Sequence, residues 1–152
     1  MGNKNFWFKH NNKIYRNPLR LLVDNLDELP FPDRELFEFQ KIIDESHCVD
    51  MFVGRGCPYQ CTNCINNGLI KLFRGRGRYV RFRSVDNVIR ELKEIIKNYK
   101  HVSYIQFQDE TFTINKVWLK EFCEKYKREV GLPFQADTRA DTVDKESLSW
   151  LK

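Results

Sequence analysis

Apolar residues recur along the second half of the chain with the period of an α-helix. Between residues 84 and 98 they return every three or four positions, behind a serine, Ser84, that suits an N-cap. A second helix is predicted from Asn115, with Gly131 placed for a C-terminal cap. Its apolar face is formed by Trp118, Leu119, Phe122, Cys123 and Tyr126. We therefore predict two long helices with one buried face each, and we expect Cys123 in a core rather than at a metal.

Shorter apolar runs, rich in β-branched and aromatic residues, predict strands at about 48–53, 102–108 and 134–138. Strands that alternate with helices favour a parallel sheet with right-handed crossovers. The predicted fold class is therefore α/β.

Weaker signals predict the remaining elements. Residues 13–18 suggest an edge strand or part of a hairpin, 65–70 a helical turn, and Asp144 the cap of a last helix. A short helix is expected after Asp33, and its core-facing side chains would be Leu36, Phe37, Ile42 and Ile43.

The first 33 residues differ from the rest of the chain. Pro30 and Pro32 prevent regular pairing in segment 26–33, which is typical of a linker. We expect a connector over residues 1–33 and a domain over residues 34–152. Three strands are too few to close a barrel, and the chain ends soon after its last predicted helix begins. We therefore expect the sequence to be part of a longer protein.

The composition suits one domain of ordinary size, since the chain has 152 residues of which 41% are hydrophobic. No apolar run is long enough to span a membrane, and the N-terminus lacks the apolar core of a signal peptide. We expect a cytoplasmic location, where cysteines stay reduced and available for metals.

The net charge of +5 is concentrated in one stretch: Lys71, Arg74, Arg76, Arg78, Arg81 and Arg83. Such a run can bind RNA or phosphate. We favour a solvated basic loop beside a negatively charged cofactor, and nucleic acid is not an expected partner. Arg81 and Arg83 lead directly into a predicted helix, so a structural role is open to them.

Three cysteines follow the first predicted strand, with gaps of three and two residues: Cys57, Cys61 and Cys64. Three thiolates on one loop can hold three irons of a cubane cluster and leave the fourth iron open to a substrate or cofactor. Gly54 and Gly56 allow backbone conformations that a side chain would forbid. A zinc ion is the alternative, and it would need a fourth ligand such as His47 or Cys48. That alternative would make the chain a zinc-dependent nucleic-acid-binding module.

Polar residues follow each predicted strand. The cysteine loop follows the first, Asp109 and Glu110 follow the second, and Arg139 follows the third. Because chemistry in parallel α/β folds lies at the carboxyl ends of the strands, these groups are expected to share one site.

The cysteine motif and its neighbours, Arg55-Gly56-Cys57-Pro58-Tyr59, resemble the radical SAM superfamily. Segment 25–33 is similar to the connector that follows the cobalamin-binding domain in cobalamin-binding members. The resemblance implies the first three βα units of a TIM-like barrel, in a truncated, partial (βα) form. It implies a 4Fe–4S cluster on the three cysteines, and S-adenosylmethionine on the open iron, cleaved by one electron to a 5′-deoxyadenosyl radical.

The resemblance also implies roles for single residues. Asp109 or Glu110 would accept hydrogen bonds from the methionine ammonium, since charge-assisted bonds are strong. Arg139 would pair with the cofactor carboxylate or fix the acidic pair, or it would form a salt bridge with Asp137 or Asp141.

The sequence departs from the family pattern at several points, and Asp109-Glu110 stand in place of its usual glycine-rich acidic motif. Asn63 stands where the family commonly has an aromatic residue against the adenine, so that contact would fall to Tyr59 or Ile65.

The resemblance finally implies what the whole protein would use. Cobalamin would be bound by the full-length protein and would serve methyl transfer or rearrangement. The substrate would be a small molecule or biosynthetic intermediate, and the reductant a flavodoxin or ferredoxin. Because a partial barrel leaves sheet edges unpaired, we expect this chain alone to bind the cluster with little or no turnover.

Overall fold

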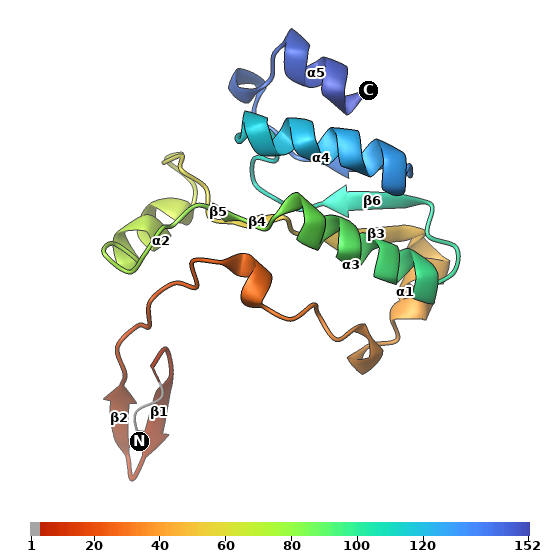
Figure 1. Cartoon of the computed structure of the whole chain (residues 1–152). Helices are drawn as coiled ribbons and strands as arrows, with labels where there is room; N and C mark the ends of the chain where they lie inside the picture. The colour runs from red at the N-terminus through yellow and green to blue at the C-terminus, as the bar shows by residue number, and fades with distance from the viewer. Residues whose placement is uncertain (1–3) are drawn as a thin grey trace. The chain divides into compact units, whose positions relative to one another are not determined.

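The computed structural model describes residues 4–152, which form two compact units. The smaller unit comprises residues 4–24 and Gly56–Val80, and the larger comprises Asn25–Arg55 and Arg81–Lys152. Figure 1 traces their elements along the chain. The expected division into a connector over residues 1–33 and a domain over residues 34–152 stays a prediction.

The larger unit contains a three-stranded parallel sheet in the order β3 (Cys48–Met51), β6 (Tyr104–Phe107), β7 (Phe134–Ala136). Val49 lies opposite Ile105, and Ile105 lies opposite Phe134. The α/β class and the parallel sheet are thus confirmed. Whether the sheet belongs to a (βα) barrel stays a prediction.

Three helices in the larger unit begin at the expected caps. They are α3 (Val85–Asn98), α4 (Lys116–Glu129) and α5 (Lys145–Leu151). The side chains of Ser84, Asn115 and Asp144 each accept a backbone N–H in the first turn of their helix. In Figure 1, α4 lies beside both α3 and α5.

Aromatic rings of α4 and the sheet form much of the core. The Phe122 ring stacks on Trp118 at 5.0 Å and meets Phe107 edge-on at 5.4 Å. Phe112 and Phe134 complete this cluster. Cys123 is buried beside it, as expected.

The segment after Asp33 differs from expectation. A single 3-10 turn forms at Arg34–Leu36, and α1 (Phe39–Ser46) starts after an extended residue, Phe37. This break resets the helical phase, so Leu36 is 76% exposed and Phe37 and Ile42 are exposed too. Of the four expected core residues only Ile43 is buried.

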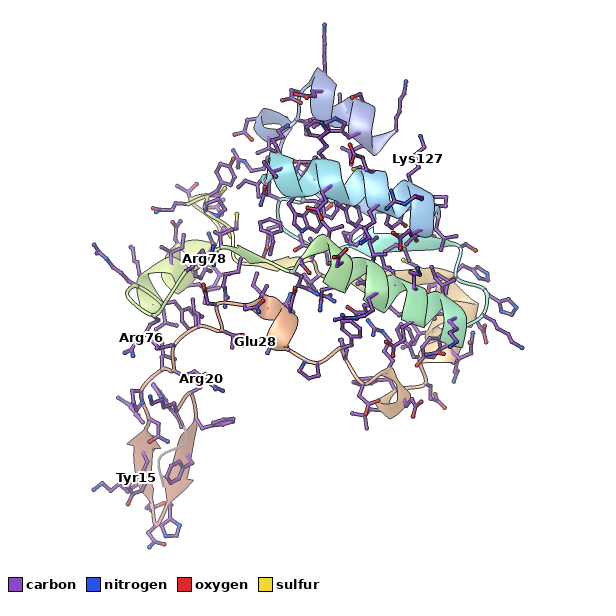
Figure 2. All side chains as sticks on the ribbon, in the orientation of Figure 1. Tyr15, Arg20, Glu28, Arg76, Arg78 and Lys127 are labelled. Atoms are coloured by element: carbon purple, nitrogen blue, oxygen red, sulfur yellow. The ribbon has the colours of Figure 1, made fainter. Side chains whose placement is uncertain are left out.

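The smaller unit contains a hairpin of β1 (Trp7–His10) and β2 (Lys13–Arg16), together with α2 (Asn66–Leu72). Asn11 and Asn12 have φ values of 47° and 60°, which suit a two-residue hairpin turn. Tyr15, labelled in Figure 2, lies on β2. The hairpin alternative for residues 13–18 is thus confirmed.

The chain leaves the larger unit at β4 (Gly54–Arg55) and re-enters it at β5 (Arg81–Phe82), and these two strands pair antiparallel. Gly56–Val80 is therefore an insertion between two paired strands. No helix among residues 4–152 has the length and apolar character needed to cross a bilayer.

Candidate functional site

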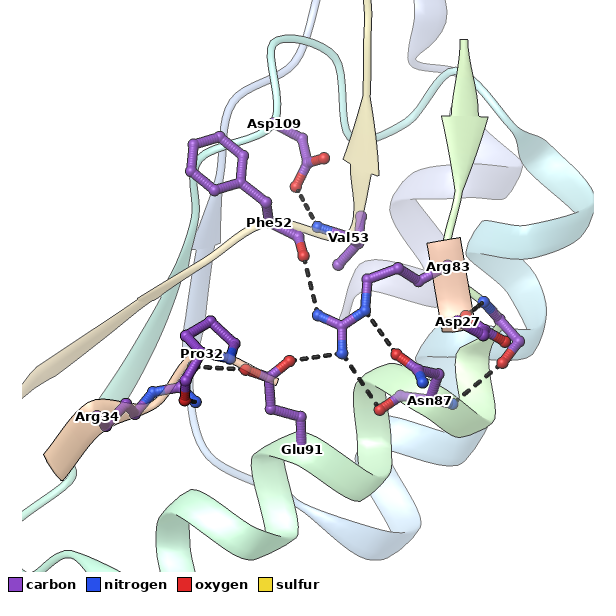
Figure 3. A network of polar contacts seen from close by, with 10 residues as sticks. Asp27, Pro32, Arg34, Phe52, Val53, Arg83, Asn87, Glu91 and Asp109 are labelled. Atoms are coloured by element: carbon purple, nitrogen blue, oxygen red, sulfur yellow. Dashed lines mark hydrogen bonds and ion pairs between the residues drawn. The ribbon is translucent and has the colours of Figure 1, made fainter. Parts of the chain in front are cut away.

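The turn that leads from β3 toward the cysteine loop is fixed by Asp109, two residues beyond β6. Its Oδ2 accepts the N–H of Val53 at 2.8 Å, and its Oδ1 accepts the N–H of Gly54 at 2.7 Å. Figure 3 shows the bond to Val53. These bonds end β3 at Met51, so the strand is shorter than the predicted 48–53. Asp109 thus holds the backbone at the carboxyl end of β3.

Burial of Asp109 changes its acidity. The side chain is 5% exposed, and desolvation raises its pKa to about 6, although the two backbone N–H groups oppose the shift. Glu110, the next residue, is exposed to solvent. Asp109 and Glu110, expected as alternatives for one role, therefore differ: the Asp109 carboxylate is bonded to the backbone, whereas that of Glu110 is accessible.

Two glycines beside this turn have no room for a side chain. A Cβ on Gly54 would lie 3.0 Å from the carbonyl oxygen of Arg81 and 3.2 Å from Asp109 Oδ1. Gly56 has a φ of +83°, and its Cβ would overlap the carbonyl oxygen of Tyr79. The close approaches explain both glycines ahead of the cysteines.

The cysteine loop of the smaller unit is held by Asn66, the first residue of α2. The Asn66 Nδ2 donates to the carbonyl oxygens of Cys57 at 2.8 Å and Tyr59 at 2.5 Å. Its Oδ1 accepts the hydroxyl of Tyr79 at 2.8 Å, and its backbone N–H donates to the Sγ of Cys64 at 3.4 Å. One residue therefore contacts the chain at both the first and third cysteines.

Asn67 holds the middle of the same loop. Its Nδ2 donates to the carbonyl oxygen of Cys61 at 2.8 Å, which also accepts the N–H of Cys64 at 3.0 Å. Cys57 is half-buried, Cys61 and Cys64 are exposed, and none of the three is in a disulfide. The loop thus presents accessible thiols from a backbone that is fixed by side chains.

Within residues 4–152, no three His, Cys, Asp or Glu side chains converge on a single-ion site. A cubane cluster binds each ligand at a separate iron corner, so it does not require such convergence. The donor set of three accessible thiols on one loop suits that kind of group.

The other two cysteines have different surroundings. Cys48 is buried on β3 and Cys123 on α4. Burial raises the pKa of Cys123 to about 11 and also raises the pKa of Cys48, so both thiols stay protonated near neutral pH. Protonated, buried thiols are poor metal ligands, because the thiolate is the ligating form.

Arg139 forms the salt bridge that was one of its expected alternatives. Its Nε and Nη2 lie 3.0 Å and 2.8 Å from the two carboxylate oxygens of Asp141. This pairing lowers the pKa of Asp141. Tyr59 is half-buried and Ile65 is exposed; a contact of either with adenine stays a prediction.

The basic run divides between the two units. In the smaller unit, Arg76 Nη1 donates to the carbonyl oxygen of Leu19 at 3.1 Å, and Arg78 forms an ion pair with Asp24 at 3.1 Å. Arg76 and Arg78 are labelled in Figure 2. These side chains hold segment 19–24, while Lys71, Arg74 and Arg78 remain exposed. The expected solvated loop beside a negatively charged cofactor stays a prediction.

Arg83 has a structural role in the larger unit. Its Nη2 lies 2.5 Å from Glu91 on α3, and Glu91 also pairs with Arg34 at 2.5 Å (Figure 3). Glu91 is 1% exposed, so a buried carboxylate is flanked by two guanidinium groups. Arg83 also donates to Phe52 O at 3.2 Å and to Asn87 Oδ1 at 2.7 Å. This triad of Arg34, Glu91 and Arg83 joins α3 to the segment before α1 and to the end of β5.

Sequence reasoning did not identify Asn66, Asn67 or Glu91. Two consecutive asparagines after the third cysteine were an available signal, because amide side chains can bond to loop carbonyls. Glu91 lies on the same helical face as Val88 and Ile95, and a charge among apolar positions calls for a buried partner.

Comparison with known proteins identifies the family. The model of the Radical SAM superfamily matches residues 51–152, which include the whole cysteine loop. An uncharacterized methyltransferase of Pyrococcus horikoshii is 30% identical over 148 residues, 95% of this chain and 30% of that protein. The anaerobic magnesium-protoporphyrin IX monomethyl ester cyclase of Rubrivivax gelatinosus is 27% identical over 136 residues, 86% of this chain and 23% of that protein. The chain thus spans less than a third of either relative's length. Because the family match covers most of its residues, this chain belongs to the radical SAM superfamily.

Proposed function

We propose that this chain provides the cluster- and S-adenosylmethionine-binding part of a radical SAM enzyme. Cys57, Cys61 and Cys64 would be the three ligands of a 4Fe–4S cluster. The observation that carries this proposal is the loop itself: three accessible cysteine thiols, none of them in a disulfide, on a backbone held by Asn66 and Asn67. Family membership favours this function over the zinc-dependent nucleic-acid-binding module.

The residues present suit a cluster in charge as well as in donor type. The backbone N–H of Asn66 reaches the Sγ of Cys64, and N–H groups near cluster sulfurs stabilise added negative charge. When bound, such a cluster supplies the single electron for reductive cleavage of S-adenosylmethionine. The role of the chain is to fix the thiol positions while leaving one corner of the cluster without a protein ligand.

Binding of the S-adenosylmethionine ammonium would fall to Glu110 rather than to Asp109. Glu110 is exposed, whereas both oxygens of Asp109 accept backbone N–H groups. Arg139 is already paired with Asp141, so its part in binding the cofactor carboxylate would require that pair to open or to be shared.

The two relatives differ in the reaction that their names give, a methyltransferase and a cyclase. We therefore propose for this chain only the step that the superfamily shares, reductive cleavage of S-adenosylmethionine by the cluster. Cobalamin dependence, methyl transfer or rearrangement, a barrel architecture, a small-molecule substrate and a flavodoxin or ferredoxin reductant all stay predictions.

Anaerobic reconstitution with iron and sulfide tests the function directly. We expect wild type to bind about four irons per chain, with the absorbance and EPR of a 4Fe–4S cluster. A Cys57→Ala/Cys61→Ala/Cys64→Ala variant should bind none specifically. A Cys48→Ala/Cys123→Ala variant is the matched control, because it removes two buried thiols outside the loop and keeps the three loop cysteines, and it should retain the iron. Equal iron in wild type and the loop variant, or stoichiometric zinc in purified wild type, would overturn the proposal.

A further inference from the structure

The side chain of Asn66 is buried, and its hydrogen-bonding groups are used. It is 6% exposed, both of its amide hydrogens face carbonyl oxygens, and its Oδ1 accepts a hydroxyl. A buried amide that is fully paired fixes its surroundings, because each bond lost would leave a polar group unsatisfied. Asn66 is therefore a rigid point within the smaller unit.

The carbonyl oxygens of Cys57 and Tyr59 set the orientation of this amide, because they can only accept and therefore face its NH2 group. Its Oδ1 then faces the Tyr79 hydroxyl, which donates to it at 2.8 Å. The opposite orientation would place an oxygen against two carbonyl oxygens, which cannot donate to it. The amide orientation follows from these partners alone.

Asn66 joins the first and third cysteines by different groups. Its side chain reaches back nine residues to the Cys57 carbonyl, while its own backbone N–H donates to the Cys64 sulfur at 3.4 Å. A shift of Asn66 would therefore change both the separation of these cysteines and the bond at one sulfur.

We propose that Asn66 is a positioning residue of the cluster site, controlling how firmly the cluster is held and how easily it is reduced. The proposal rests on the proposed function, in which these cysteines ligate a cluster. Residues that orient metal ligands typically change metal affinity about 10- to 100-fold when replaced. Hydrogen bonds to cluster sulfurs make reduction easier, because they stabilise the more negative form.

The test compares neutral replacements of similar size in the reconstituted chain. Asn66→Leu keeps the backbone N–H that faces Cys64 Sγ but removes the side-chain bonds that hold it in place. We therefore expect iron transfer to a chelator to be about tenfold faster or more, and, as this N–H shifts from the sulfur, a more negative midpoint potential of the remaining cluster. Asn63→Leu is the control, since it makes the same change at an exposed position of the same loop and should match wild type in both measurements. The midpoint potential and the EPR g values report on the cluster itself. A purely structural role of Asn66 would leave both quantities unchanged.

Tyr79→Phe keeps the proposal testable if Asn66→Leu does not fold. It removes one hydroxyl and leaves the amide in place, so the same two changes should appear in smaller size. Wild-type rates and potentials in Asn66→Leu, or in Tyr79→Phe where Asn66→Leu is unfolded, would overturn this inference alone. A wild-type chain that binds no iron would overturn the proposed function, and this inference with it.

Discussion

At the scale of single residues, the buried carboxylate of Asp109 balances desolvation against two backbone N–H groups. We expect Asp109→Asn to lower the free energy of unfolding by roughly 1–3 kcal/mol at pH 4, because an amide NH2 cannot accept a backbone N–H. The folded-state pKa of about 6 lies above the ordinary aspartate value of 3.8, so the folded chain binds this proton more tightly. The stabilisation is therefore complete below pH 4 and falls as pH rises to about 6.

Urea unfolding of both proteins at several pH values measures this dependence. The stability difference between wild type and Asp109→Asn should shrink between pH 4 and pH 6, since only wild type titrates there. Asp137→Asn, which changes an exposed carboxylate after β7, should stay within about 0.5 kcal/mol of wild type. A difference that grows with pH would contradict the assignment.

At the scale of elements, α3 carries a buried charge on its apolar face. Glu91→Gln would leave the half-buried Arg34 and Arg83 without the buried carboxylate that pairs with both, and we expect a loss of about 3–5 kcal/mol in the free energy of unfolding. Glu94→Gln makes the same change at an exposed position of the same helix and should cost less than about 0.5 kcal/mol. Denaturant unfolding measures the free energy of unfolding of the two variants, and equal values would refute a structural role for the triad.

Elements with a local signal could be predicted from the sequence. The caps at Ser84, Asn115 and Asp144 and the apolar faces behind them depend on neighbours within one or two turns, and those predictions are confirmed. The end of β3 and the phase of segment 34–43 could not be predicted. The end of β3 depends on Asp109, which is more than fifty residues away. The phase of segment 34–43 depends on Phe37, an extended residue that separates a 3-10 turn from α1.

At the scale of the whole molecule, the cysteines were recognisable from their spacing, but the side chains that hold their loop were not. The bonds of Asn66 form only when α2 turns back toward the loop, and those of Arg76 and Arg78 bring together segments more than fifty residues apart. The division into two units, each built from separated segments, follows from such contacts and has no signal in composition.

The insertion of Gly56–Val80 between β4 and β5 suggests that the larger unit can fold without it. Its buried core, from Ile43 to Tyr126, contains no residue of the insertion. Arg55 pairs with Arg81, so a two-residue Asn-Gly turn can join the strands in place of the insertion. We expect this shortened chain to unfold cooperatively on heating, as followed by circular dichroism, and to bind no iron after reconstitution. A chain with helical signal but no cooperative transition would show that the core requires the insertion, and retained iron would show that the cysteine loop is not the cluster site.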